Sequence, residues 1–314
     1  MRQRVRQPVV IAVAISVLLW SSAFVAIRFV ARQLGPGELA LARLAVGSLA
    51  LGFAMLVRRE RVPRGRAAGF AVLSGLLWFG VYNVALNAAE QRIDAGTSAL
   101  LVNTGPIFLA LLAGSVLNEG FPRALMAGCA VSFLGVALIA AGVSHHGLQA
   151  TWGALLCLLA AVVYAGGVVA QRPALRDSSA LSVTWLACTV AALACLGWTP
   201  GLVSELGRAS GATIGWTVYL GVGPLAVGFG AWAFALARSS SVGRLGVSTY
   251  LVPPLVVLIS WLALAQAPPL LAAPGGVLCL AGVALTRRRA GAGGTVQPPA
   301  PQDRSAIRSV ARST

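Results

Sequence analysis

The sequence predicts an all-α integral membrane protein with ten transmembrane helices arranged as two inverted five-helix repeats. Three observations predict this fold. The 314 residues are 58% hydrophobic and only 10% charged, and a mean hydropathy of +0.83 is not that of a soluble protein. Ten long apolar runs follow one another with short polar breaks. The second half of the chain also matches the first when the sequence is shifted by 147 residues.

The apolar runs each hold roughly 17 to 25 residues, enough to cross about 30 Å of hydrocarbon as a helix. We expect helices at 9–30, 37–57, 67–89, 97–117, 124–143, 152–169, 181–198, 214–236, 242–265 and 270–285. The first run follows Arg2, Arg4 and Arg6 as a secretory signal would, but it stays apolar as far as Val30. We therefore expect it to remain in the protein as the first helix.

The positive charge of the chain, formally +16, is carried entirely by 24 arginines. With the N-terminus placed in the cytoplasm, 19 of them fall in cytoplasmic loops and tails and four fall outside, while Arg43 lies within the second helix. This bias predicts that both termini and the loop at 58–66 face the cytoplasm of a plasma membrane. Because the arginines do not gather on one face of a segment, we expect no nucleic-acid partner.

The internal repeat divides the chain into two halves. The 147-residue shift places Pro106 on Pro253, and it places Gly-Val-Ala-Leu at 135–138 on the same sequence at 282–285. Five helices per half is an odd number, so the second half enters the membrane from the opposite side. The predicted division is a cytoplasmic N-terminus at 1–8, a first repeat at 9–143, an outer linker at 144–151, a second repeat at 152–286, and a disordered, basic cytoplasmic tail at 287–314.

The two halves resemble a known family. The first EamA repeat of the drug/metabolite transporter superfamily is similar to four parts of the first half, namely 20–28, Arg43, 97–119 and 128–138. The second repeat resembles 152–285, including Tyr164, 221–236 and Pro253. The resemblance implies a ten-helix carrier with a central cavity lined by both repeats, and export of small metabolites as the commonest activity. One departure is Ala265-Gln266, where the family usually has Gly-Glu, and we expect it to affect helix-end capping or gating more than substrate choice.

Polar side chains within the apolar runs are the candidate substrate-binding residues, because burying an unpaired polar group costs several kcal/mol. These candidates are Trp20, Ser21, Tyr82, Asn83, Asn103, Thr104, Tyr164 and Tyr250. Any single serine, threonine or asparagine among them has the alternative of a hydrogen bond between helices. As a set they favour one cavity drawn from both repeats.

Four further residues are candidates for gating or for hinges: Arg43, Glu90, Pro106 and Pro253. Arg43 lies six residues after Gly37, roughly 9 Å below the outer end of its helix. It is a candidate anchor for a substrate carboxylate or a gate with Glu90 or Asp94, and the alternative is an interfacial ion pair whose guanidinium reaches the membrane surface. The two prolines break equivalent helices and are candidate hinges, with ordinary kinks as the alternative.

Several features bear on what the protein does not do. The five cysteines lie in apolar runs without zinc spacing, and His145-His146 has no further ligands nearby in the sequence, so we expect neither a metal nor a cofactor. All eight acids fall at helix ends, in loops or in tails, so no carboxylate is expected at mid-membrane to trap a cation. Four tryptophans are expected to face lipid or the membrane interface: Trp78, Trp216, Trp232 and Trp261.

The leading hypothesis is a secondary transporter that moves a small neutral, zwitterionic or anionic metabolite, such as an amino acid, and that acts as an exporter. Its partners are then the small-molecule substrate and membrane lipid, and a homodimer is compatible with the sequence. A non-transporting receptor or scaffold and a multidrug efflux protein are the alternatives. An enzyme is not expected, because no paired-Asp, HExxH or GxSxG constellation occurs near the membrane.

Overall fold

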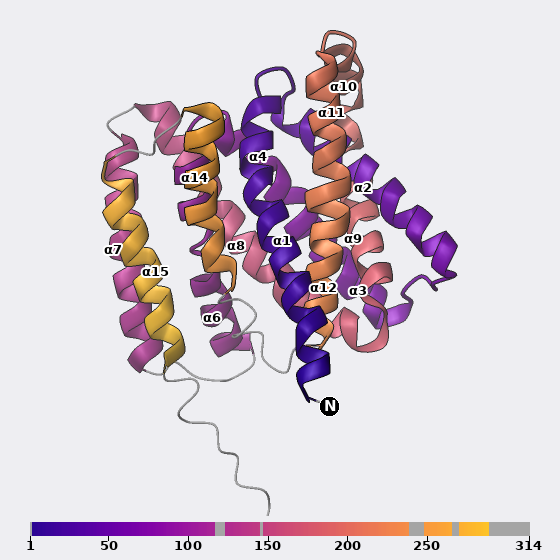
Figure 1. Cartoon of the computed structure of the whole chain (residues 1–314), viewed down its shortest axis with the longest axis horizontal. Helices are drawn as coiled ribbons and strands as arrows, with labels where there is room; N and C mark the ends of the chain where they lie inside the picture. The colour runs from indigo at the N-terminus through magenta and orange to yellow at the C-terminus, as the bar shows by residue number, and fades with distance from the viewer. Residues whose placement is uncertain (1, 117–122, 145–146, 239–247, 266–269, 289–314) are drawn as a thin grey trace, which may run out of the picture.

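The computed structural model describes residues 2–116, 123–144, 147–238, 248–265 and 270–288, and these are helical apart from short turns (Figure 1). In chain order the segments are α1 Arg2–Val30, α2 Pro36–Arg58, α3 Gly65–Ser74, η1 Gly75–Val81, α4 Tyr82–Glu90, α5 Ala95–Val102, α6 Gly105–Val116, α7 Arg123–Ser144, α8 Leu148–Asp177, α9 Ala180–Ala194, η2 Leu196–Trp198, α10 Thr199–Leu206, α11 Gly211–Leu220, η3 Gly221–Gly228, α12 Phe229–Arg238, η4 Ser248–Leu251, α14 Val252–Leu264 and α15 Ala272–Arg288. Asn118-Glu119, His145-His146, Gln266 and the tail from 289 onward lie outside the described residues.

The prediction of an all-helical, multi-pass membrane protein is confirmed. Among the described residues, five continuous helical segments are long and apolar enough to cross a membrane, and a sixth counts if the pair Ala180–Ala194 and Leu196–Leu206, bent by 48°, forms one span. The five are Gln7–Val30, Pro36–Arg58, Gly65–Glu90, Leu148–Asp177 and Gly211–Arg238. The full count of ten spans stays a prediction, because shorter helices such as Val252–Leu264 fall below that length.

Local signals in the sequence set where several helices begin. Asp94 accepts a hydrogen bond from the backbone N–H of Thr97 at 2.8 Å and so caps α5. Ser179 and Ser210 cap α9 and α11 in the same way, with side-chain oxygens 3.1 and 3.2 Å from backbone nitrogens three residues later. Pro36 is the first residue of α2. A backbone N–H at this position would have no partner within the helix, so proline loses nothing there.

Two of the spans contain a π-helical stretch at equivalent places in the repeats. A shift of 147 residues carries η1, residues 75–81, onto 222–228, which lies within η3. Each stretch begins with a glycine pressed against another helix. A β-carbon at Gly75 would lie 2.5 Å from the carbonyl oxygen of Ala187 in α9, and one at Gly221 would lie 2.8 Å from that of Arg43 in α2. Only glycine permits these close approaches, and π-helical turns are frequent at functional sites.

The two prolines that the sequence marks as breaks in mid-run each lie at the start of a helical segment. The fourth run is divided at Asn103 and Thr104, and Pro106 lies in the first turn of α6. The ninth run changes from the 3-10 turn η4 to α14 at Val252, so Pro253 also lies in a first turn. Proline is tolerated there because the first turn lacks hydrogen-bond partners for its N–H groups in any case. In the fourth run the helix is broken just before the proline, and in the ninth the helix type changes there.

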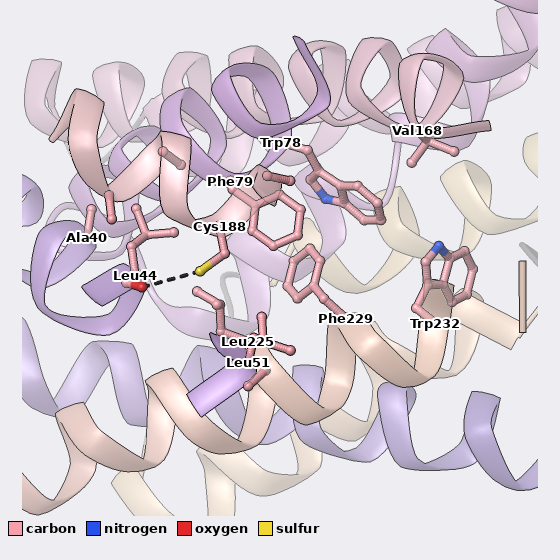
Figure 2. Packing of buried hydrophobic residues seen from close by; sticks show 14 of the residues in the cluster. Ala40, Leu44, Leu51, Trp78, Phe79, Val168, Cys188, Leu225, Phe229 and Trp232 are labelled. Carbon is pink, nitrogen blue, oxygen red and sulfur yellow. Dashed lines mark hydrogen bonds between the residues drawn. The ribbon is translucent and has the colours of Figure 1, made fainter. Parts of the chain in front are cut away.

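Helix α1 joins the two halves of the fold. It packs against α4 and α5 from the first half, and against α11, η3, α12 and α14 from the second. The last helices of the two halves, α7 and α15, lie side by side at one edge (Figure 1). The interior between the halves is rich in aromatic residues, and Figure 2 shows Trp78, Phe79 and Phe229 facing one another there.

The expectation that four tryptophans face lipid or the interface is wrong for two of them. Trp78 and Trp232 are 2% and 1% exposed and belong to the interior cluster, whereas Trp216 and Trp261 are 44% and 60% exposed. Trp78 lies in η1 and Trp232 in α12, and both pack near the ring of Trp20, with centroids 6.3 and 5.2 Å from it. A large apolar side chain fits lipid and protein interior equally well, so its identity alone does not decide its direction.

Candidate functional site

A cavity lies in the middle of the bundle, between α1, α2, η1, α4, α5, α8, α12, η4 and α14. About 680 Å³ of empty space lies between its side chains, a figure that includes the part open to the outside, and the centre of a water molecule has about 70 Å³ in which to move. This exceeds the roughly 10 to 15 Å³ that a single water needs, so the cavity has room for a small ligand.

Aromatic rings form much of the cavity wall. They belong to Trp20, Phe24, Trp78, Tyr82, Tyr164 and Phe229. Trp78 lies near the centre of the group, with ring centroids 5.3 Å from Tyr164 and 4.9 Å from Phe229. Their edge-to-face and tilted arrangement is the favoured geometry for packed rings, so the wall is a pre-formed apolar surface.

The polar groups on the wall are few, and four of their buried atoms are hydrogen-bond donors without a partner among the described residues. Nε1 of Trp20, Nε and Nη1 of Arg43 and Nδ2 of Asn103 are buried without an acceptor in the described part of the chain. Asn103 lies at the break between α5 and α6, where the helix end leaves its side chain on the cavity. Tyr82, Tyr164 and Thr249 also line the wall. No acidic residue does so among the described residues, so the cavity favours a ligand that brings acceptors.

Arg43 does not reach the membrane surface, and the expectation of a guanidinium extended to the interface is wrong. The residue is 3% exposed, because α2 is covered by α4, α9 and η3. Glu90 is fully buried, and neither of its carboxylate oxygens accepts a hydrogen bond from a described residue. The guanidinium of Arg28 in α1 donates a hydrogen bond to the backbone oxygen of Glu90.

The cavity brings together five of the predicted residues: Trp20, Arg43, Tyr82, Asn103 and Tyr164. Three others bond to their own helix and do not line it. Ser21, Asn83 and Thr104 donate to the carbonyl oxygens of Val17, Phe79 and Leu101, each at 2.7 Å. Glu90 and Pro253 are buried away from the cavity wall. The backbone of Tyr250 lies in η4 and that of Pro106 in α6, and their side chains are outside the described part of the structure.

Sequence reasoning missed Trp78, Phe229 and the apolar lining residues. The internal repeat could have indicated some of these residues. The 147-residue shift places Tyr82 on Phe229, and Val102 on Thr249. Both members of each pair line the cavity. Trp78 has no such signal, because the same shift places it on Leu225, which packs in the core.

The sequence pattern of the EamA-like transporter family matches this chain twice, at residues 7–141 and 151–288. A protein of Streptantibioticus cattleyicolor, named "Probable terminal-alkyne amino-acid exporter", is 38% identical over 278 residues, which cover 88% of this chain and 93% of that protein. "Uncharacterized transporter YdfC" of Bacillus subtilis is 33% identical over 91% of this chain and 92% of its own length.

More distant similarities point the same way. "Probable amino-acid metabolite efflux pump" of Salmonella typhimurium is 28% identical to this chain over 287 residues, which cover 85% of this chain and 90% of that protein. A solved structure described as "Crystal structure of protein" superposes with a TM-score of 0.62 at 22% sequence identity, over 88% of this chain and 96% of that one. This structural likeness shows the fold alone.

Proposed function

This chain belongs to the EamA-like transporter family and is a multi-pass membrane transporter, not an enzyme, and from this premise we propose that it exports a small amino acid or a closely related metabolite. Two relatives that align over most of both chains are named for the export or efflux of amino acids or their metabolites. One of them shares 38% of its residues with this chain over the aligned region. We place the protein in the plasma membrane with both termini in the cytoplasm, as the arginine distribution predicts.

The central cavity is the observation that carries this proposal. Its wall combines one buried arginine, a few neutral polar groups and six aromatic side chains, and its size suits a small amino acid. A deep, mostly apolar pocket with a few convergent polar groups is typical of a small-molecule site. A receptor or scaffold has no need of such a cavity at the junction of two repeats.

We propose further that ten spans, in two inverted repeats, provide alternating access to this cavity. The π-helical stretches η1 and η3 occupy equivalent places in the repeats, and so do the starts of α6 and α14 just before Pro106 and Pro253. In transporters with inverted repeats, broken helices at such equivalent positions flank the substrate site. One half can move against the other by bending at these irregular segments. Such a motion does not require a regular α-helix to be broken.

Export can be tested in cells and in a purified system. Strains that overexpress or lack the protein are compared by untargeted measurement of metabolites in the medium, and purified protein in liposomes is then tested with the amino acids that differ. We expect at least one small apolar amino acid to accumulate outside the overexpressing strain and to cross protein-containing liposomes. Equal metabolite levels in the media of the two strains, together with no transport by the purified protein, would favour the receptor or scaffold alternative.

A further inference from the structure

The guanidinium of Arg43 is a buried cationic group with unused hydrogen-bond donors on the wall of the cavity. The residue lies within α2, is 3% exposed, and lines the cavity together with Trp20 and Asn103. Neither its Nε nor its Nη1 has an acceptor in the described part of the chain. Unpaired charged donors in a protein interior are costly, so a position like this one is explained best by a ligand that completes it.

The acid expected to pair with Arg43 has a different neighbour. Glu90 in α4 is buried, and the guanidinium of Arg28 in α1 donates a hydrogen bond to its backbone oxygen. Both carboxylate oxygens of Glu90 are without a hydrogen-bond partner among the described residues, so it makes no direct bond to Arg43. Arg43 therefore makes no direct bond to an acid among the described residues, and it lines the cavity with a buried guanidinium.

The other unpartnered groups on the wall match the same kind of ligand. An indole and a guanidinium carry donors and no acceptors, so Nε1 of Trp20 and the Arg43 group can be satisfied only by an acceptor, such as a ligand oxygen. A planar guanidinium binds a carboxylate through two parallel hydrogen bonds, and such charge-assisted bonds are stronger than neutral ones. The remainder of the wall is aromatic or aliphatic, and it suits a short apolar side chain.

We propose that Arg43 binds the carboxylate of the substrate, with Nε1 of Trp20 as an additional donor, so that the cavity selects small monocarboxylates with an apolar side chain. The ammonium group of an amino acid then lies against the aromatic rings, which attract cations through their faces. This inference rests on the proposed export of amino acids and adds a stated chemical requirement, an ionised carboxylate on the substrate.

The test compares amino acids with their amides, which lack only the carboxylate. Purified protein is reconstituted in liposomes loaded with L-valine, L-norvaline or L-propargylglycine, or with the amide of each, and exit is followed by mass spectrometry against protein-free liposomes. We expect the wild-type protein to move the acids roughly tenfold or more faster than the amides at low concentration. The Arg43→Gln variant should lose this preference by slowing the acids while leaving the amides near their wild-type rates.

Two further variants separate the effect of the charge from a general loss of structure. Arg43→Lys keeps the positive charge but lacks the planar guanidinium that makes two parallel hydrogen bonds. This variant should retain the preference for acids at a lower transport rate. Arg58→Gln, the same substitution at an exposed position on the same helix, should change neither rate. If Arg43→Gln does not fold, the ratio of acid to amide transport rates in the wild-type protein and in Arg43→Lys still tests whether the cavity selects a carboxylate.

The possible failures are distinguishable. Equal transport of acids and amides by the wild-type protein would overturn the inference while leaving amino-acid export intact, as would a preference for acids that survives in Arg43→Gln. If none of the three amino acids or their amides moves faster than in protein-free liposomes, the proposed export of small amino acids fails, and the inference fails with it.

Discussion

A β-carbon at Gly105 would lie 2.5 Å from Cδ1 of the Tyr164 ring and 3.3 Å from the carbonyl oxygen of Ala161. Gly105 is the first residue of α6, directly after the break at Asn103 and Thr104, and Tyr164 is in the middle of α8. The ring of Tyr164 thus lies directly on the broken backbone, and this contact joins the two repeats beside the cavity. The first residue of the second helical piece has to be glycine for the ring to occupy that place.

The variant Gly105→Ala should lower the free energy of unfolding by about 1 to 3 kcal/mol, because the added methyl group overpacks the contact with Tyr164. Gly69→Ala in α3 is the matched control, since a β-carbon there meets nothing within 4 Å. The control should be neutral or slightly stabilising, because alanine favours a helix over glycine. Thermal unfolding in detergent measures both, and equal melting temperatures for the two variants would contradict the prediction.

The hydroxyl groups of Ser22 and Tyr219 are 2.6 Å apart and link α1 with α11. A double-mutant cycle with Ser22→Ala and Tyr219→Phe should give a coupling of about 0.6 kcal/mol, and at most about 1.7 kcal/mol, as is usual for hydrogen bonds between helices in membranes. Stability is measured by denaturant unfolding in mild detergent. Strictly additive effects of the two substitutions would mean that this bond contributes nothing to stability.

Trp20 lines the cavity, and replacing it with phenylalanine removes an indole N–H that has no acceptor among the described residues. We expect Trp20→Phe to slow amino-acid transport by roughly three- to tenfold with little loss of stability, since the donor serves the substrate. Trp232→Phe is the matched control, because Trp232 also has an unpartnered Nε1 but does not line the cavity. An equal loss of transport in both variants would assign the effect to packing.

The orientation of the chain is testable by labelling single introduced cysteines. Arg61 follows α2 and Ser204 lies in α10, and both are exposed. An impermeant maleimide applied to intact cells should label Ser204→Cys, while Arg61→Cys should react only after the cells are broken. The described native cysteines are buried and should give little background. Labelling of Arg61→Cys in intact cells would reverse the proposed topology.

Permanent organic cations should be poor substrates. Among its described residues the cavity wall has no carboxylate and carries the Arg43 cation, so a quaternary ammonium group has no countercharge there.

We expect at most indirect coupling of transport to protons, through Glu38, Glu90 or Asp94. Ethidium movement in liposomes with an imposed pH gradient measures this, and strong proton-driven transport that survives neutralising all three acids would favour the multidrug alternative.

Much of the architecture is determined by local and repetitive features of the sequence. Apolar runs long enough to cross a membrane must be helical, because a lipid environment offers the backbone no other partners for its hydrogen bonds. Pro106 and Pro253 could be recognised as equivalent breaks because the repeat aligns them. Their exact effect, a new helix started just before each proline, follows from the N–H group that proline lacks.

The direction of each side chain was decided by the tertiary structure. Trp20 and Ser21 are adjacent polar candidates, yet Trp20 lines the cavity and Ser21 donates to its own helix. Trp78 is in the interior while Trp216 is exposed. In a soluble protein, polar residues mark the outer face of a helix, but lipid is as apolar as a protein core, so hydrophobicity does not distinguish the two faces of these helices. Only the packing of α4, α9 and η3 around α2 turned Arg43 from a candidate surface cation into a buried group on the cavity wall.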